Sequence, residues 1–264
     1  MRVRSHTPLW RRALRQAGRR LFRLAENNDD PRLEHNGEQW LLRELVQAHV
    51  RSGATRPLVV FDAGANVGGY THEVLRAAQA AHCAVEVHLF EPSPRCLETL
   101  REAFAGVPAV RIVAAAVAAA RGEAVLHDGG LGSSQASLVP RDVLSGDASA
   151  GVTVTLLPLG DYLAEQAIVH VDLLKLDVEG SELAALRGLG AHLRPATIGL
   201  VQFEHGGSAL DARTTLRDVY ELLAAQGYRV AKLFPHAVEV RDYAVWMEHY
   251  AYANYVALPP VDHP

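Results

Sequence analysis

The chain has 264 residues, 49% of them hydrophobic, and a formal net charge of −4 at pH 7. This allows a substantial core and, for an α/β protein, a single domain. Two cysteines, Cys83 and Cys96, cannot form a disulfide framework, and no Cys/His cluster has zinc-finger spacing, so no metal site is expected. No apolar run approaches the roughly 20 residues that span a bilayer, and no signal-peptide core follows the first arginines. We therefore expect a soluble, cytoplasmic protein.

Residues 1–35 form a basic extension ahead of a domain at residues 36–264. Eight arginines come before the first acidic residue, Glu26, although the whole chain has 26 basic and 30 acidic residues. The domain itself is thus acidic, which argues against a nucleic-acid partner. An amphipathic helix within residues 1–25 is predicted by apolar residues at helical spacing: Trp10, Leu14, Ala17, Leu21 and Leu24. Two interpretations stay open: contact with an anionic membrane surface or polyanion, or a surface helix packed on the domain or a poorly ordered terminus.

A helix is expected at residues 38–50, and a buried strand and glycine turn follow it. The apolar run at residues 58–61 is typical of a parallel strand, whose carboxyl end is a common ligand site. The glycines follow a G-x-x-x-G-G pattern, not the G-x-G-x-x-G of dinucleotide-binding proteins. Asp62 at this turn would repel a pyrophosphate but could accept hydrogen bonds from an ammonium group, and the Asn66 amide can donate and accept nearby.

A second strand, residues 85–90, follows a helix at residues 71–82 and ends in Glu91. A carboxylate in this position can accept hydrogen bonds from both ribose hydroxyls of an adenosine. A site with an ammonium-binding end and a ribose-binding end indicates S-adenosylmethionine. After a helix at residues 94–105 and a strand at 110–117, the small and polar residues 129–137 predict a loop that closes over the cofactor.

Charged residues gather at the end of a strand at residues 171–176. Lys175 lies in this strand, and Asp177 and Glu179 follow it. At the carboxyl edge of a parallel sheet these side chains would lie in an active site, although Lys175 and Asp177 could also form a structural ion pair. The strand at residues 197–203 is followed by His205, a candidate base at neutral pH, although a lone histidine is commonly structural.

Two last strands, residues 228–233 and 254–258, close the sheet after a helix that starts at Thr215 and stops at Gly227. An aromatic segment with Tyr243, Trp246 and Tyr250 joins them. Core packing or an acceptor pocket would explain these aromatic residues.

Three segments together resemble the FkbM family of S-adenosylmethionine-dependent methyltransferases. They are residues 62–71, residues 90–94 and residues 174–182, the last containing K-L-D-V-E-G-S-E, and the resemblance extends from about residue 38 to 258. It implies a class I Rossmann-like α/β fold, with a mostly parallel seven-stranded sheet and a C-terminal antiparallel hairpin. It also implies methyl transfer, usually to a hydroxyl of a sugar or natural product, so the partner expected is a small-molecule or glycan acceptor.

The resemblance and the residue patterns together define the candidate site. The cofactor-binding candidates are Asp62, Gly64, Asn66, Gly68, Tyr70, Thr71, Glu91 and Pro92. The catalytic candidates are Lys175, Asp177, Glu179 and His205. The segment that the family implies for the adenine ring is Ala114-Ala115-Ala116, which has no polar side chain, so backbone groups or other residues would have to recognise the ring.

Other functions stay open at this point. The acceptor could be an amine, or the protein could be a non-catalytic S-adenosylmethionine-binding or membrane-associated scaffold. Methyl transfer could also be assisted by a magnesium ion on Asp177 and Glu204. An NAD-dependent dehydrogenase is disfavoured by the glycine spacing. Neither the acceptor's identity nor the oligomeric state is indicated by the sequence.

Overall fold

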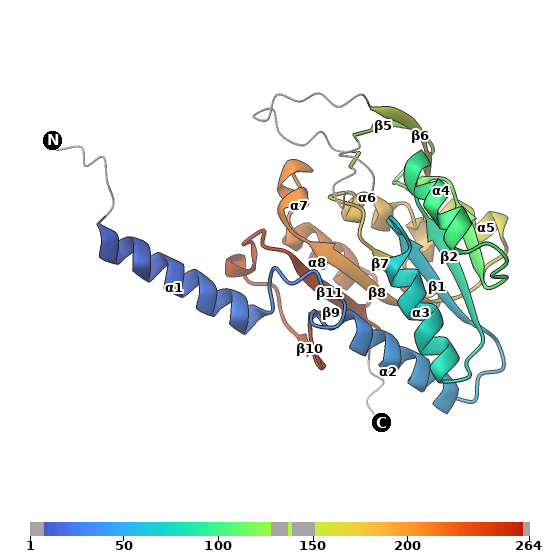
Figure 1. The fold of residues 1–264 in the computed structure, drawn as a ribbon, viewed down its shortest axis with the longest axis horizontal. Coiled ribbons are helices and arrows are strands. Elements are labelled where there is room, and N and C mark those ends of the chain that lie inside the picture. The colour runs from blue at the N-terminus through green and yellow to red at the C-terminus, as the bar shows by residue number, and fades with distance from the viewer. Residues whose placement is uncertain (1–7, 128–136, 139–150, 261–264) are drawn as a thin grey trace.

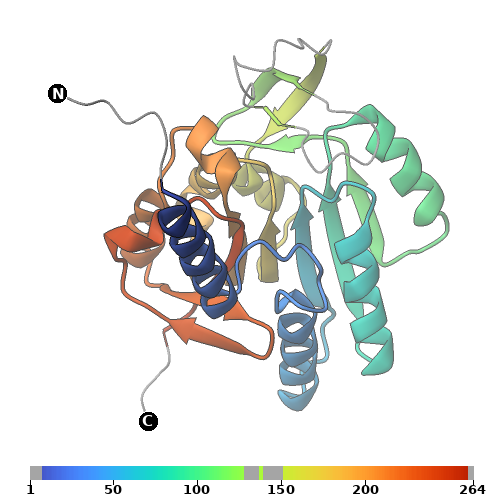
Figure 2. The ribbon, with the colours of Figure 1, turned by 60° about the vertical axis from the view of Figure 1, so that its left-hand side comes forward.

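The computed structural model describes residues 8–127, 137–138 and 151–260. In Figures 1 and 2 these residues form a central sheet with helices on both faces, a smaller sheet above one end, and one helix that projects from the body. Of the predicted loop at residues 129–137, only Ser137 belongs to the described residues.

Within the described residues, the main sheet has eight strands in the order β10-β9-β11-β8-β7-β1-β2-β3. The strands from β8 to β3 in this order are parallel, whereas β11 runs antiparallel to β8 and β9. This confirms the predicted class I arrangement. The strands are β1 (Leu58–Ala63), β2 (Val85–Phe90), β3 (Val110–Val113), β7 (Val171–Leu176), β8 (Ile198–His205), β9 (Arg229–Phe234), β10 (Ala237–Val240) and β11 (Ala253–Leu258).

The sheet has one strand more than the seven predicted. The extra strand, β10, pairs antiparallel with β9. It forms because Pro235 and His236 reverse the chain directly after β9. The four residues that follow the turn then pair with β9. The predicted strand at residues 110–117 is also divided, since β3 ends at Val113 and its continuation joins a second sheet.

Helices cover both faces of the main sheet because its buried strands are apolar on both sides. In β1, Val60 packs toward one face and Phe61 toward the other, as successive residues of a strand must. The Val60 face carries α2 (Glu38–Arg51), α3 (Gly69–Ala80) and α4 (Pro94–Ala103). The Phe61 face carries α5 (Leu159–Glu165), α6 (Glu182–Arg187) and α8 (Leu216–Ala225). Shorter connecting helices are α7 (Gly207–Asp211), η1 (Gly190–His192) and η2 (Val245–Met247).

A three-stranded sheet lies beyond the carboxyl ends of β1 and β2 (Figure 1). It consists of β4 (Ala116–Val117), β5 (Gly122–Leu126) and β6 (Val152–Leu157), in the order β4-β6-β5. Leu126 and Val154 of this sheet are buried in one apolar cluster with Ala116. The small sheet thus places apolar side chains above the edge where the sequence predicts a ligand.

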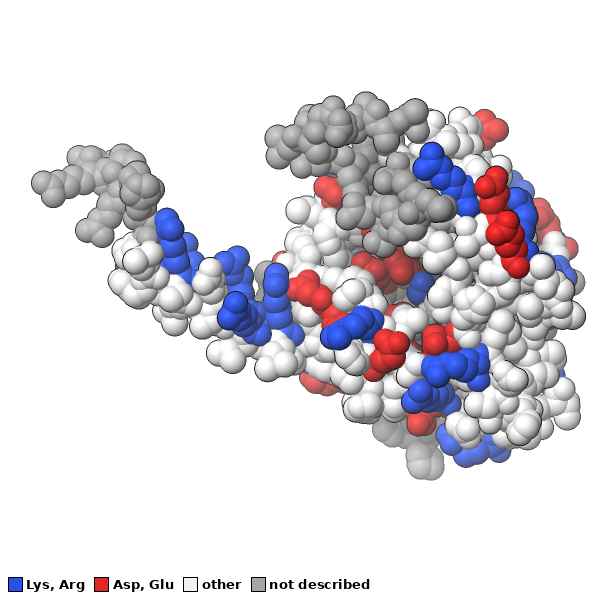
Figure 3. Space-filling model, in the orientation of Figure 1, with Lys and Arg blue, Asp and Glu red and all other residues white. Residues whose placement is uncertain are grey.

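The predicted N-terminal helix is present as α1 (Leu9–Glu26), and it projects away from the layers (Figures 1 and 3). No side chain of α1 is buried. The interpretation in which its apolar stripe packs on the domain is therefore wrong for the described residues. None of the described helices combines the length and apolar character needed to cross a membrane.

Candidate active site

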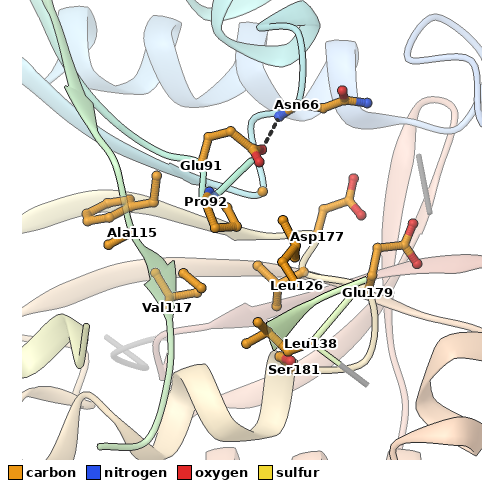
Figure 4. Close-up of a pocket in the computed structure, with 14 residues that line it drawn as sticks. Asn66, Glu91, Pro92, Ala115, Val117, Leu126, Leu138, Asp177, Glu179 and Ser181 are labelled. Atoms are coloured by element: carbon orange, nitrogen blue, oxygen red, sulfur yellow. Dashed lines mark hydrogen bonds between the residues drawn. The ribbon is translucent and has the colours of Figure 1, made fainter. Parts of the chain in front are cut away.

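A cleft opens at the carboxyl ends of β1, β2 and β7, between the main sheet and the small one (Figure 4). Its walls come from four parts of the chain that are far apart in sequence. They are Gly64 and Asn66 after β1, Phe90, Glu91 and Pro92 at the end of β2, Ala115 to Val117 with Leu126 and Leu138, and Asp177, Val178, Glu179 and Ser181 after β7.

Glu91 is held on the cleft wall by backbone groups. Its Oε2 accepts a hydrogen bond from the Asn66 N–H at 2.8 Å, drawn in Figure 4, and its Oε1 accepts one from the Ser93 N–H at 2.8 Å. The residue is only 5% exposed. Because the two N–H groups follow β1 and β2, this carboxylate joins the two strand ends and has a fixed orientation.

The wall opposite the charged residues is apolar. Ala115 and Val117 lie across the cleft from Asp177 in Figure 4. Leu126 and Leu138 complete this part of the wall. Among the described residues, the segment at 115–117 has no polar side chain, as the sequence indicated for residues 114–116. A planar ring in this slot would be held by packing and by backbone groups.

Gly64 allows the two halves of the cleft to meet. Its φ is +81°, and a Cβ there would lie 1.8 Å from the carbonyl oxygen of Asp177. Any other residue would force the turn after β1 away from the end of β7. The Asp177 N–H instead donates to the Ala63 carbonyl at 3.1 Å, which fixes Asp177 at the cleft.

Half of the predicted cofactor-binding residues do not line the cleft. Those that line the cleft are Gly64, Asn66, Glu91 and Pro92, and those that do not are Asp62, Gly68, Tyr70 and Thr71. Asp62 has no exposed surface, because the first turn of α3 covers it and Thr71 donates to its Oδ2 at 2.7 Å. Its Oδ1 lies 3.5 Å from the Lys175 ammonium. The prediction that Asp62 faces an ammonium group is thus corrected in one respect: that ammonium belongs to the protein.

Lys175 is a buried cation, 5% exposed, on the α2 and α3 side of the sheet. Its Nζ donates to Asp177 Oδ2 at 3.2 Å and lies 4.9 Å from the centre of the Tyr70 ring. Burial opposes its charge, but Asp177, Asp62 and Glu38 outweigh that effect and raise the pKa of Lys175 well above its usual value. Lys175 therefore stays protonated beside the cleft.

Glu38, the first residue of α2, is buried near Lys175. It is 3% exposed, and its carboxylate accepts hydrogen bonds from Asn36 Nδ2 at 2.6 Å and from Gln202 Nε2. The Tyr70 hydroxyl donates to Gln202 Oε1 at 3.0 Å. Burial raises the pKa of Glu38 above its usual value, although Lys175 opposes this effect. A polar layer beneath the cleft thus links α2 to Lys175.

Asp177 and Glu204 form a carboxyl pair at the cleft. The Asp177 side chain is 36% exposed because it faces the opening. Glu204, on β8, hydrogen-bonds to it, and burial together with Asp177 raises the pKa of Glu204 well above its usual value. Burial also opposes ionisation of Asp177, but Lys175 and the bond from Glu204 keep the pKa of Asp177 below its usual value. The two pKa shifts thus have opposite directions, which favour the ionised form of Asp177 and the protonated form of Glu204.

Sequence reasoning considered Glu204 only as a metal ligand and did not name it as part of a carboxyl pair. The pairing depends on the register of β7 and β8, which the sequence does not record. Lys175 lies opposite Gln202, and side chains two residues further along each strand share that face. Among the described residues, no group of three or more His, Cys, Asp or Glu side chains is arranged to hold a metal ion.

His205 points to the opposite face of the sheet from Glu204. Its ring lies 5.5 Å from the Tyr250 ring, and its Nε2 lies 3.7 Å from Glu248 Oε2. Burial lowers the pKa of His205 to about 4. The side chain does not line the cleft. The prediction of His205 as a base beside Asp177 is therefore corrected: it belongs to the packing between β8 and the aromatic segment.

The remaining acidic residues of the K-L-D-V-E-G-S-E run have different places. Glu179 lines the cleft beside Asp177 (Figure 4), with a φ of +52° and a carbonyl that accepts from Ser137 Oγ at 2.8 Å. Glu182 instead shapes the turn, since its Oε1 accepts from the N–H groups of Val178 at 3.0 Å and Gly180 at 3.3 Å. Burial raises the pKa of Glu182 to about 7.

Comparison with known families agrees with this geometry. The model of the methyltransferase FkbM domain matches residues 62–230, which is more than half of the chain. The chain belongs to the FkbM methyltransferase family. This sets aside the dehydrogenase alternative. A curated relative is the 31-O-demethyl-FK506 methyltransferase FkbM of Streptomyces tacrolimicus, 30% identical over 222 residues that cover 73% of this chain and 82% of the relative.

Solved structures of similar proteins include the methyltransferase FkbM of Methylobacillus flagellatus, with a TM-score of 0.48, 16% identity, and coverage of 80% of this chain and 47% of that one. Another is the CMeT domain of the citrinin polyketide synthase, with a TM-score of 0.43, 14% identity, and coverage of 78% and 48%. The chain thus matches about half the length of each of these proteins.

Proposed function

We propose that this chain transfers the methyl group of S-adenosylmethionine to a hydroxyl group of a sugar, glycan or other natural product. The residues of the cleft fit this cofactor. Glu91 suits the ribose hydroxyls, and the apolar slot around Ala115 and Leu126 suits the adenine ring. The methionine end would then lie toward Asp177. When bound, the cofactor supplies an electrophilic methyl group on a positively charged sulfur.

The observation that carries the proposal is the placement of Asp177, which lines the cleft and lies 3.2 Å from the Lys175 ammonium. The Asp177 side chain is 36% exposed toward the cleft, and Lys175 lowers its pKa, so its carboxylate can accept a hydrogen bond from an acceptor hydroxyl. A weak base suffices, because the hydroxyl proton becomes acidic only as the new C–O bond forms. Glu204 and Lys175 hold the carboxylate in place meanwhile. The bond between the methyl carbon and sulfur would break as the C–O bond forms, and Asp177 would take the proton and release it to solvent.

Alignment of the two reactants would supply most of the rate. Holding two reactants in position can be worth about 7–11 kcal/mol, whereas a general base contributes about a hundredfold to ten-thousandfold. Two residues of the cleft are held in fixed positions that suit such alignment. The Glu91 carboxylate accepts hydrogen bonds from backbone N–H groups, and the Asp177 N–H donates to the Ala63 carbonyl. Specificity for a hydroxyl is supported by the curated relative, whose name describes an O-demethyl substrate.

The test is a transfer assay with S-adenosylmethionine that carries a deuterated methyl group. The acceptors are hydroxylated glycans and macrolides, each with a matched amino analogue, and fragmentation mass spectrometry locates the label. Label on oxygen supports the proposal, and label only on nitrogen would replace it with N-methylation. The assay is repeated after chelation, since loss of activity would favour a metal on Asp177 and Glu204. A chain that binds no cofactor in calorimetry would favour a scaffold.

A further inference from the structure

The apolar stripe of α1 faces away from the rest of the protein. Its large members, Trp10, Leu14, Leu21 and Leu24, are 62%, 66%, 68% and 82% exposed. The contacts of α1 with the body come from other positions near its C-terminal end. The Phe22 ring packs edge-on against Trp246 and His249, and Glu26 accepts a hydrogen bond from Arg241 at 2.6 Å.

The helical geometry separates these two sets of side chains. At 3.6 residues per turn, the stripe is centred near Trp10 and Leu21, and Phe22 and Glu26 lie about 120° to 160° around the helix from it. Glu26 is also 3.5 Å from the buried ammonium of Lys232, so the attachment is charged as well as apolar. The body therefore contacts the side of α1 opposite the stripe, and the stripe stays exposed to solvent.

The other side of α1 is strongly basic. Within the helix there are six arginines and no acidic residue before Glu26: Arg11, Arg12, Arg15, Arg19, Arg20 and Arg23. Figure 3 shows basic side chains along one side of the projecting helix and uncharged side chains along the other. Arg11 and Arg20 border the stripe, and the Arg11 guanidinium lies 5.1 Å from the centre of the Trp10 ring.

We propose that α1 binds the surface of an anionic lipid bilayer and lies in the plane of the interface. Its stripe enters the boundary between head groups and acyl chains, and its arginines attract the anionic head groups. With a length of about 27 Å at 1.5 Å per residue, the whole helix can contact the surface lengthwise. Because the body contacts the side of α1 opposite the stripe, it would stay on the aqueous side of the interface and would not block contact between the stripe and the bilayer.

Two other occupants fit less well. A second copy of α1 packed stripe to stripe would cover the apolar side chains but would give no role to the arginines on the opposite side, and the stripe covers fewer than the three or four heptads typical of a coiled coil. A nucleic acid would use the arginines but would leave the apolar stripe in water. A bilayer with anionic lipids accounts for both sides of the helix.

The experiment measures flotation of the full-length protein with vesicles of phosphatidylcholine alone or mixed with phosphatidylglycerol. The stripe variant is Leu14→Gln with Leu21→Gln, and the charge variant is Arg12→Gln with Arg15→Gln and Arg19→Gln. Glutamine keeps the helix, and all five positions are exposed, so folding should be unaffected. The matched control is Val169→Gln, which removes an 85% exposed apolar side chain from the body.

We expect binding to the anionic vesicles only. The partition coefficient should fall about tenfold or more in the stripe variant and in the charge variant, and be unchanged in the control. No binding by the wild type would overturn the proposal. Binding that the stripe variant retains would also overturn it, in favour of adsorption to any polyanion, which a duplex DNA competitor would show. A dimer in sedimentation analysis that the stripe variant dissociates would overturn it in favour of self-association.

Discussion

The two halves of the cleft are built in different ways. On the side that we propose binds adenosine, Glu91 is positioned by N–H groups from turns within its own and the neighbouring βα unit, and the slot beside it is made of small apolar residues. On the side of Asp177, a buried lysine and several carboxyl groups from α2, β1, β7 and β8 interact. The first half depends on local backbone geometry, and the second on charges brought together by the sheet.

This difference separates binding from chemistry. A carboxylate fixed by backbone N–H groups stays in place whatever the protonation of its neighbours, which suits the recognition of a ligand. The Asp177 side is instead a set of coupled groups in which the charge of each depends on the others. Changes on the first side should alter cofactor affinity, and changes on the second should alter turnover.

The largest effect is expected for Asp177→Asn. The amide keeps the shape of the side chain but cannot take a proton, so the turnover number should fall about a hundredfold to ten-thousandfold while the dissociation constant of the cofactor changes little. Steady-state kinetics and calorimetry measure the two. Glu179→Gln, on the same wall, should lose less; equal losses would mean that the acidic wall as a whole, and not the pair, is required.

Glu91→Gln should act on the other half. Charge-assisted hydrogen bonds are worth about 1.5–3 kcal/mol, so the dissociation constant of S-adenosylmethionine should rise about tenfold to a hundredfold, with little change in turnover at saturation. Glu98→Gln, an exposed change on α4, is the matched control in the same titration. A variant that binds the cofactor normally but turns over slowly would contradict the division between the halves.

His205→Gln tests the placement of this residue outside both halves. Its folded pKa of about 4 lies below the ordinary 6.5, so the unfolded chain binds more protons between these values, and the stability that neutral His205 provides is lost as pH falls from 6.5 toward 4. The free energy of unfolding in urea should therefore drop by about 2 kcal/mol more in the wild type than in the variant between pH 7 and pH 5.

The exposed residue His236 provides the control, as His236→Gln, for this comparison. If the wild type and His205→Gln have the same pH dependence, then His205 is not buried in its neutral form. Turnover at pH 7 should be retained in His205→Gln, because the side chain does not line the cleft. A loss as large as that of Asp177→Asn would restore it as the base.

The smallest effect is expected for Glu204→Gln. A protonated carboxyl and an amide both donate a hydrogen bond, so turnover should stay within about threefold of the wild type. Glu204→Leu removes the donor and should reduce turnover about tenfold or more. A large loss in Glu204→Gln would show that Glu204 works as a carboxylate, and would favour Glu204 over Asp177 as the base.

The sequence by itself determined the order of the elements and the edge that carries the site. Short apolar strands, the glycines after β1 and the acidic residues after β2 and β7 are local patterns, and the carboxyl ends of parallel strands necessarily meet at one edge. Glu91 and Asp177 could therefore be predicted to lie at the same edge of the sheet, and both line the cleft. The amphipathic character of α1 was equally local, because it depends only on the helical repeat.

Only the tertiary structure decided which side chains share a face and which are sealed from the cleft. Glu204 and His205 are adjacent in sequence, yet one lies beside Asp177 and the other beside Tyr250, because a step of one residue along a strand reverses the face. The burial of Asp62 depends on packing of α3, and the partners of Lys175 come from segments distant in sequence. The outward direction of the α1 stripe likewise depends on contacts between Phe22 and the distant Trp246, which no local pattern records.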